Sequence, residues 1–188
     1  MSAFEESIPH RDRIERFLTE HGAESIPHPG GTLLAHLKRV ADLLAEWDAD
    51  SHIQAAGLCH AAYGTDGFGQ SLLDLGERAT LVNLLGEQAE ALVYFYGSCD
   101  RGETYPGLDG SPVRFRDRFT GQDQHPDPAT LAAFMEITAA NELDVMTQNS
   151  ELAAEHGAAL HGFFGRTAHL LSPKAWHACH TCLPPINP

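Results

Sequence analysis

The chain has 188 residues, 43% of them hydrophobic, and a formal net charge of −14 at pH 7. This size and composition are typical of one globular domain, and the charge argues against nucleic acid and anionic membranes as partners. No apolar run reaches the ~20 residues of a membrane span, and acidic residues 1–6 do not resemble a secretory signal. Four cysteines are too few for a disulfide framework, so a cytoplasmic location is expected.

The first third of the chain predicts three helices joined by short loops. Apolar spacing indicates a helix over 10–21, followed by a rigid Pro- and Gly-rich loop at 27–31. Thr32 can cap a second helix that runs to about residue 48. A third helix is expected from about 51 to 60, so short connections should place these helices side by side.

The middle of the chain alternates between helices and glycine-rich loops. A loop at 63–69 precedes a short helical turn at 71–75, and residues 77–99 are expected to be helical with a break at Gly86. Residues 100–127 are too rich in Gly, Pro and Asp to form one long helix. Within them, the alternation at 113–119 can form a short hairpin strand.

The last part predicts two further helices and a tail. Asp127 and Pro128 form an N-cap and first-turn pair for a helix reaching about Gln148. A last helix is expected over 150–171, ended by Pro173. The fold class is therefore all-α. It is a single-domain helical bundle over 1–172, with an irregular insertion at about 100–127 and a C-terminal tail at 173–188.

Two histidines lie on the apolar faces of predicted helices. His36 shares the apolar stripe of the second helix, and His60 lies at the inward end of the third. Either one alone is more often a hydrogen-bonded core residue than a ligand, because a buried imidazole needs partners. Together with the polar Asn141 and Asp144 of a later helix they favour a shared site, since imidazole and carboxylate suit Zn, Fe, Mn or Ni.

The order of these residues resembles the HD superfamily of helical metal-dependent enzymes. That family's ligands run His, then an adjacent His-Asp pair, then a distant Asp. The resemblance covers about residues 28–148, and it places His36, His60 and Asn141 on the two histidines and the distant Asp. It implies an HD-type helical fold and a catalytic metal site.

Two departures limit what the resemblance implies. Ala61 stands where the family has the Asp of the His-Asp pair, and neutral Asn141 replaces the distant Asp. A dinuclear site is therefore not expected, and the family's phosphohydrolase and di-iron oxygenase chemistries are in doubt. A mononuclear site from His36, His60 and Asp144, with His28 or water completing it, is the expected form if a metal binds at all.

Further candidate residues each have an ordinary structural alternative. Tyr63 follows His60 by three residues and can act as a donor or acid, or be a buried core tyrosine. His28 can reach the site, or lie exposed in its loop. Arg118, in the arginine stripe 114–118, can hold an anionic substrate group, or belong to a solvated face paired with nearby acids; Arg101 has similar standing.

The tail contains two cysteines and two histidines, which are all potential metal ligands. They lie within residues 177–182, but zinc sites with this Cys spacing need a second pair of ligands elsewhere in the chain. The expectation is a docked or flexible tail.

The leading functional hypothesis is an HD-like biosynthetic enzyme acting on a small, anionic metabolite in an interhelical cavity. His36 and His60 would be mononuclear metal ligands, or general acid and base if no metal binds. The alternative is a catalytically inactive relic that binds a ligand or a partner protein. A small-molecule substrate is the expected partner, and homodimerisation is left open.

Overall fold

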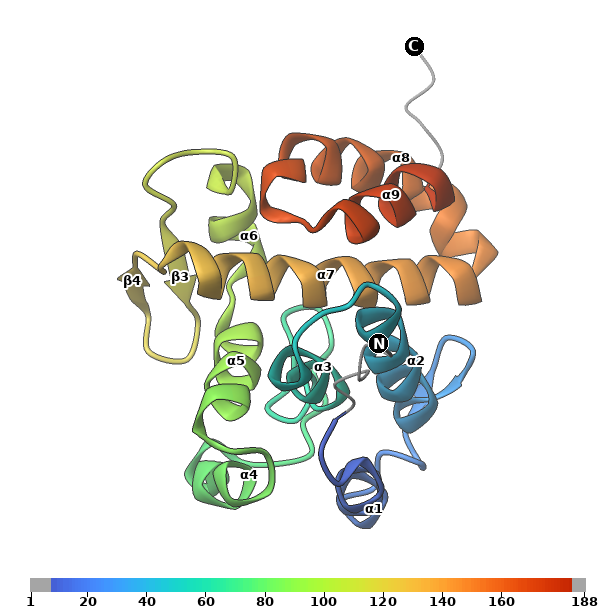
Figure 1. Ribbon diagram of the computed structural model, residues 1–188, viewed down its shortest axis with the longest axis vertical. Coiled ribbons are helices and arrows are strands. Elements are labelled where there is room, and N and C mark those ends of the chain that lie inside the picture. Colours follow the sequence, from blue (N-terminus) through green and yellow to red (C-terminus); the bar gives the residue numbers. More distant parts are fainter. Residues whose placement is uncertain (1–7, 184–188) are drawn as a thin grey trace, which may run out of the picture.

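A computed structural model describes residues 8–183 of the chain (Figure 1). Acidic residues 1–6, in which no secretory signal was expected, and the end of the expected tail lie outside these residues. The elements are α1 (Arg11–Glu20), β1 (Pro27–His28), β2 (Gly31–Thr32), α2 (Leu33–Glu46), α3 (Ser51–Leu58), η1 (Leu75–Glu77), α4 (Arg78–Leu85), α5 (Glu87–Ser98), α6 (Arg101–Thr104), η2 (Tyr105–Gly107), β3 (Phe115–Asp117), β4 (Gln122–Gln124), α7 (Pro128–Gln148), α8 (Ser150–Arg166), η3 (Ala168–Leu170) and α9 (Pro173–Cys182). The expected all-α class is confirmed.

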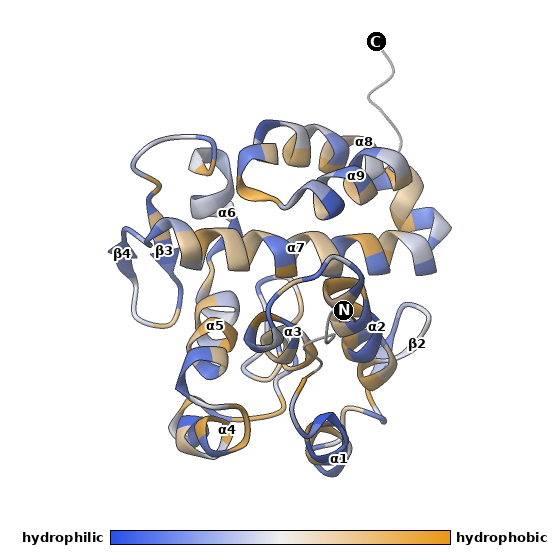
Figure 2. Cartoon of the chain, in the orientation of Figure 1, coloured by the Kyte–Doolittle hydropathy of each residue, from blue (hydrophilic) through white to orange (hydrophobic). Residues whose placement is uncertain are grey.

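The long helix α7 is the centre of the bundle. It packs on α2, α3 and α5 on one side and on α8 and α9 on the other, so it separates two helical layers (Figure 1). Its inward residues, among them Phe134, Met135 and Ile137, are almost fully buried. Hydrophilic residues gather on the outer helix α1 and on the β3–β4 hairpin (Figure 2), as expected when burial of apolar surface drives folding.

Local capping signals account for several helix boundaries. The Thr32 hydroxyl accepts a hydrogen bond from the Ala35 amide at 3.2 Å, and the Asp127 carboxylate caps α7 through the amides of Ala129 and Thr130. Gly86 separates α4 from α5 with a φ of 86°, a left-handed conformation that glycine adopts without strain. These three predicted boundaries are confirmed.

Helices α2 and α3 cross closely because one contact residue is a glycine. A Cβ at Gly57 would overlap the Leu44 side chain and lie 3.5 Å from Val40. This close crossing brings His36 of α2 and His60, just beyond α3, to the same side of α7.

The irregular region between α5 and α7 contains the predicted hairpin. β3 pairs antiparallel with β4, with Phe115 opposite Gln124 and Asp117 opposite Gln122. Arg114 and Arg116 both pair with Asp123 at the surface, at 3.2 and 3.1 Å. The solvated-face interpretation holds for these two arginines.

The C-terminal segment differs from the prediction. α8 ends at Arg166, and Pro173 begins a new helix, α9, instead of ending the previous one. Proline is favoured in a first helical turn because that position needs no amide donor. Ala175 and Cys179 of α9 are buried, so residues 173–182 form a docked helix.

The four cysteines are all free, and Cys59 and Cys99 are buried as expected of small core residues. No helix within residues 8–183 is long and apolar enough to cross a membrane.

Candidate functional site

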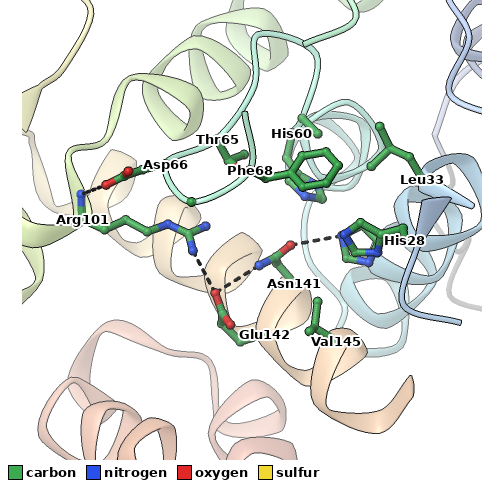
Figure 3. A pocket seen from close by; sticks show the side chains of 13 residues that line it. His28, Leu33, His60, Thr65, Asp66, Phe68, Arg101, Asn141, Glu142 and Val145 are labelled. Carbon is green, nitrogen blue, oxygen red and sulfur yellow. Dashed lines mark hydrogen bonds and ion pairs between the residues drawn. The ribbon is translucent and has the colours of Figure 1, made fainter. Parts of the chain in front are cut away.

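A cavity of about 180 Å³ lies where α2, the end of α3 and α7 meet the loop after His60 (Figure 3). Its walls combine polar side chains of both charges with a few apolar ones. The lining residues are His28, Leu33, His36, His60, Ala61, Thr65, Asp66, Gly67, Phe68, Arg101, Asn141, Glu142 and Val145. The expected interhelical cavity is therefore present, and five of the candidate residues line it: His28, His36, His60, Arg101 and Asn141.

His36 is held from behind by a buried ion-pair network. Its Nδ1 lies 2.6 Å from Asp144 Oδ2, and Arg39 binds the same carboxylate through Nε at 2.6 Å and Nη2 at 2.9 Å. Burial favours a higher pKa for Asp144, but the hydrogen bonds from His36 and Arg39 outweigh it and lower that pKa. The other ring nitrogen, Nε2, lies 3.1 Å from Asn141 Oδ1.

His60 has one nitrogen engaged and one available. Its Nδ1 donates to the Gly57 carbonyl at 2.7 Å, whereas Nε2 has no hydrogen-bond partner within residues 8–183. Burial, followed by the charge of His36, lowers the pKa of His60 to about 3. At neutral pH His60 is therefore an uncharged imidazole with an acceptor nitrogen. Its ring centroid lies 5.2 Å from that of His36.

His28 lies in the cavity wall, not exposed in its loop. Its ring stacks on His36 at a centroid distance of 4.0 Å and meets the edge of Phe68 at 5.5 Å. Its buried Nδ1 has no hydrogen-bond partner in the described chain. Burial lowers the pKa of His28 to about 4, so this ring is also neutral near pH 7.

A row of polar side chains crosses the cavity from Asn141 to Arg101 (Figure 3). Asn141 Nδ2 donates to Glu142 Oε1 at 3.1 Å, and Arg101 Nη1 donates to the same oxygen at 3.2 Å. Arg101 also donates to the Tyr96 hydroxyl at 3.1 Å, and its own amide binds Asp66 at 2.9 Å. Because Nδ2 has this acceptor, the amide oxygen of Asn141 is directed at His36.

The donors do not make up a complete ligand set for a catalytic metal ion. Within residues 8–183, no group of three or more His, Cys, Asp or Glu side chains is placed to hold one ion. Ala61 supplies no oxygen, and Asp144 binds the nitrogen of His36 that faces away from Asn141. The imidazoles of His28, His36 and His60 all line the cavity, but they are not placed to share one ion as the three protein ligands of catalytic zinc sites do.

Three of the sequence candidates do not line the cavity. The Tyr63 hydroxyl donates to Glu90 at 2.8 Å, and this carboxylate also binds Arg78. Arg118 is exposed and donates to the Gly97 carbonyl at 2.8 Å. Asp144 supports His36 from behind. Tyr63 and Arg118 therefore point toward α5, which contains Glu90 and Gly97, and not into the cavity.

Among the lining residues that were not candidates from the sequence are Asp66, Phe68 and Glu142. Arg101 was a candidate of the same standing as Arg118. Asp66 and Phe68 belong to the glycine-rich loop 63–69, a type of segment that often carries function. That loop's position after His60 was the available signal. The ion-pair partner of Glu142 lies 41 residues away in the chain, so the only local signal was its position next to Asn141.

A family model described as "Domain of unknown function (DUF6817)" matches residues 17–101, which is less than half of the chain. The matched part includes His28, His36, His60 and Arg101, but it ends before α7. No curated protein and no solved structure matches the chain.

Proposed function

We propose that this protein is an HD-like helical enzyme that performs general acid–base chemistry on a small polar metabolite carrying an anionic group. The observation that carries the proposal is the pair of histidines at the cavity. His36 is oriented by Asp144, and His60 presents an uncommitted Nε2. A histidine oriented by a buried carboxylate recurs in unrelated enzymes because the carboxylate fixes the tautomer and the direction of the ring.

The two histidines suit opposite roles. Acceptor oxygens lie at both nitrogens of His36, an arrangement that suits a ring with hydrogen on both nitrogens, able to give a proton to substrate. Neutral His60 takes a proton from substrate at Nε2. One proton leaves the substrate and another returns, so the step is a proton shift, and exchange with water restores both rings. Arg101 supplies the positive charge for an anionic group.

Proton exchange into deuterated water tests this proposal. Small 2-oxo acids, hydroxy acids and amino acids are incubated with the protein in D₂O, and loss of C–H signals beside the carbonyl or carboxyl group is followed by NMR. We expect exchange for one compound class, its loss in His60→Gln and His36→Gln, and its retention in His156→Gln, which alters an exposed histidine.

Two results would contradict the proposal. Binding of compounds without exchange or any other turnover would favour the ligand-binding relic instead. Exchange abolished by a chelator and restored by Mn²⁺, Fe²⁺, Ni²⁺ or Zn²⁺ would show that a metal is required and that the acid–base form is wrong.

A further inference from the structure

The cavity wall opposite the histidines carries charges of both signs. Arg101 contributes a guanidinium, and Asp66 and Glu142 contribute carboxylates. Behind the histidines, Arg39 and Asp144 neutralise each other in their ion pair. With the protonated His36 of the proposed function, the cavity therefore offers a ligand two cations, His36 and Arg101, beside the two carboxylates.

The charges of Arg101 and Glu142 are only partly satisfied by each other. Their ion pair is long, at 3.2 Å, although the side chains are only 26% and 15% exposed. Arg101 uses two of its five N–H donors, on Glu142 and Tyr96, and Glu142 Oε2 has no partner among residues 8–183. Charges removed from water need further hydrogen bonds, and a ligand can supply them.

We infer that the cavity binds a zwitterion of amino-acid size, with its carboxylate on Arg101 and its ammonium group on Glu142. This inference rests on the proposed function, whose site it shares. Asp66 and Glu142 would repel a dianion, and Arg101 would repel a simple amine. A zwitterion pairs both kinds of charge at once, and its two charged groups are as close together as those of Arg101 and Glu142.

The size and remaining walls of the cavity agree with such a ligand. A volume of about 180 Å³ admits a small metabolite and is well below the ~300 Å³ at which pockets for drug-sized ligands begin. Leu33, Phe68 and Val145 offer apolar contacts to a short side chain. His36 and His60 then face the carbon atoms next to the charged groups, where proton transfer would take place.

Calorimetric titration of the wild-type chain tests the inference without any variant. Each common amino acid, and β-alanine, is titrated at millimolar concentration. Every compound that binds is compared with its desamino acid and its decarboxylated amine, which for alanine are propionate and ethylamine. We expect at least one amino acid to bind, and both analogues to bind at least about tenfold more weakly, because each lacks one charged contact.

Two substitutions assign the charges to residues. Arg101→Gln should weaken binding of the amino acid about tenfold or more and should leave the affinity for the amine analogue unchanged. Glu142→Gln should weaken binding of the amino acid and leave the affinity for the desamino acid unchanged. The variant keeps an oxygen that can accept from Asn141, so the change removes the negative charge and not this hydrogen bond. Arg114→Gln is the matched control: it removes an exposed arginine paired with Asp123 and Glu103 and should change none of these affinities.

The inference is overturned if no amino acid binds, or if either analogue binds as tightly as its parent. It is also overturned if Arg101→Gln weakens the amino acid no more than Arg114→Gln does. These outcomes are separate from failure of the proposed function. A zwitterion that binds without proton exchange would contradict only the enzyme, and exchange on an acid that lacks an amine would contradict only the zwitterion.

Discussion

His60 illustrates how burial sets the chemistry of a single residue. Its ring is only 2% exposed, and the Gly57 carbonyl occupies Nδ1. The neutral form is therefore favoured in the folded chain, whereas the unfolded chain protonates this residue near the ordinary pKa of 6.5. The same burial that leaves Nε2 free for substrate therefore makes the fold sensitive to acid.

We predict that His60 contributes to loss of stability as the pH falls. The folded pKa of about 3 lies below the unfolded value of 6.5, so the unfolded state binds the proton first and stability declines from pH 6.5 downward. Between pH 6.5 and 5 the expected contribution is about 2 kcal/mol. Urea unfolding at both pH values should show that the free energy of unfolding declines less in His60→Gln than in wild type. In His156→Gln, which alters an exposed residue, it should decline as much as in wild type.

Asp144 is predicted to be a stabilising residue as well as a support for His36. Asp144→Asn leaves the Arg39 guanidinium and the buried His36 nitrogen without their anionic partner. The free energy of unfolding should fall by about 3 kcal/mol. Asp42→Asn is the control, because Asp42 forms an exposed pair with Arg11, and its effect should stay within about 1 kcal/mol. Similar losses in the two variants would contradict the structural role given to Asp144.

At the scale of elements, the site depends on how closely α2 and α3 cross. Leu44 of α2 occupies the space that a side chain at Gly57 would need. The carbonyl of Gly57 also accepts from His60, so one residue both permits the crossing and orients a site histidine.

We predict that Gly57→Ala lowers the free energy of unfolding by about 1–3 kcal/mol, because overpacking here must displace Leu44. Gly165→Ala is the matched control within α8: a Cβ at that position meets no atom within 4 Å. Gly165→Ala should leave the free energy of unfolding unchanged or raise it by up to about 1 kcal/mol, because alanine has the higher helix propensity. Thermal unfolding of both variants checks this, and equal behaviour would show that the crossing tolerates a methyl group.

At the scale of the whole molecule, α9 completes the second layer on α7. The Ser172 amide, just before α9, donates to the buried carboxylate of Glu136 in α7, and Ala175, Cys179 and Leu183 are buried. The segment expected to be a tail is therefore part of the core.

Removal of residues 173–188 should lower the free energy of unfolding by at least about 2 kcal/mol, through loss of buried apolar surface. Urea unfolding measures the change. Cys182→Ser alters an exposed residue of the same helix and should leave the midpoint unchanged. A truncated chain with the wild-type midpoint would mean that α9 adds nothing to the core.

The sequence by itself determined the helical class and most boundaries, because their signals are local. Thr32, Gly86, Asp127 and Pro128 each act on the backbone within a few residues. Periodicity also predicted that His36 and His60 are buried, and for His36 the direction of the side chain follows from its own helix; His60 is buried too but lies in the turn just beyond α3. Pro173 was misinterpreted because proline marks both the end of one helix and the first turn of the next.

Only the tertiary structure decided which side chains meet. His36 and Asp144 are 108 residues apart, and Arg101 and Glu142 are 41 apart. Tyr63, three residues after His60, binds Glu90 outside the cavity. These pairings depend on how α2, α5 and α7 cross, and helix crossing is set by packing across the core. The spacing of residues along one helix carries no record of it.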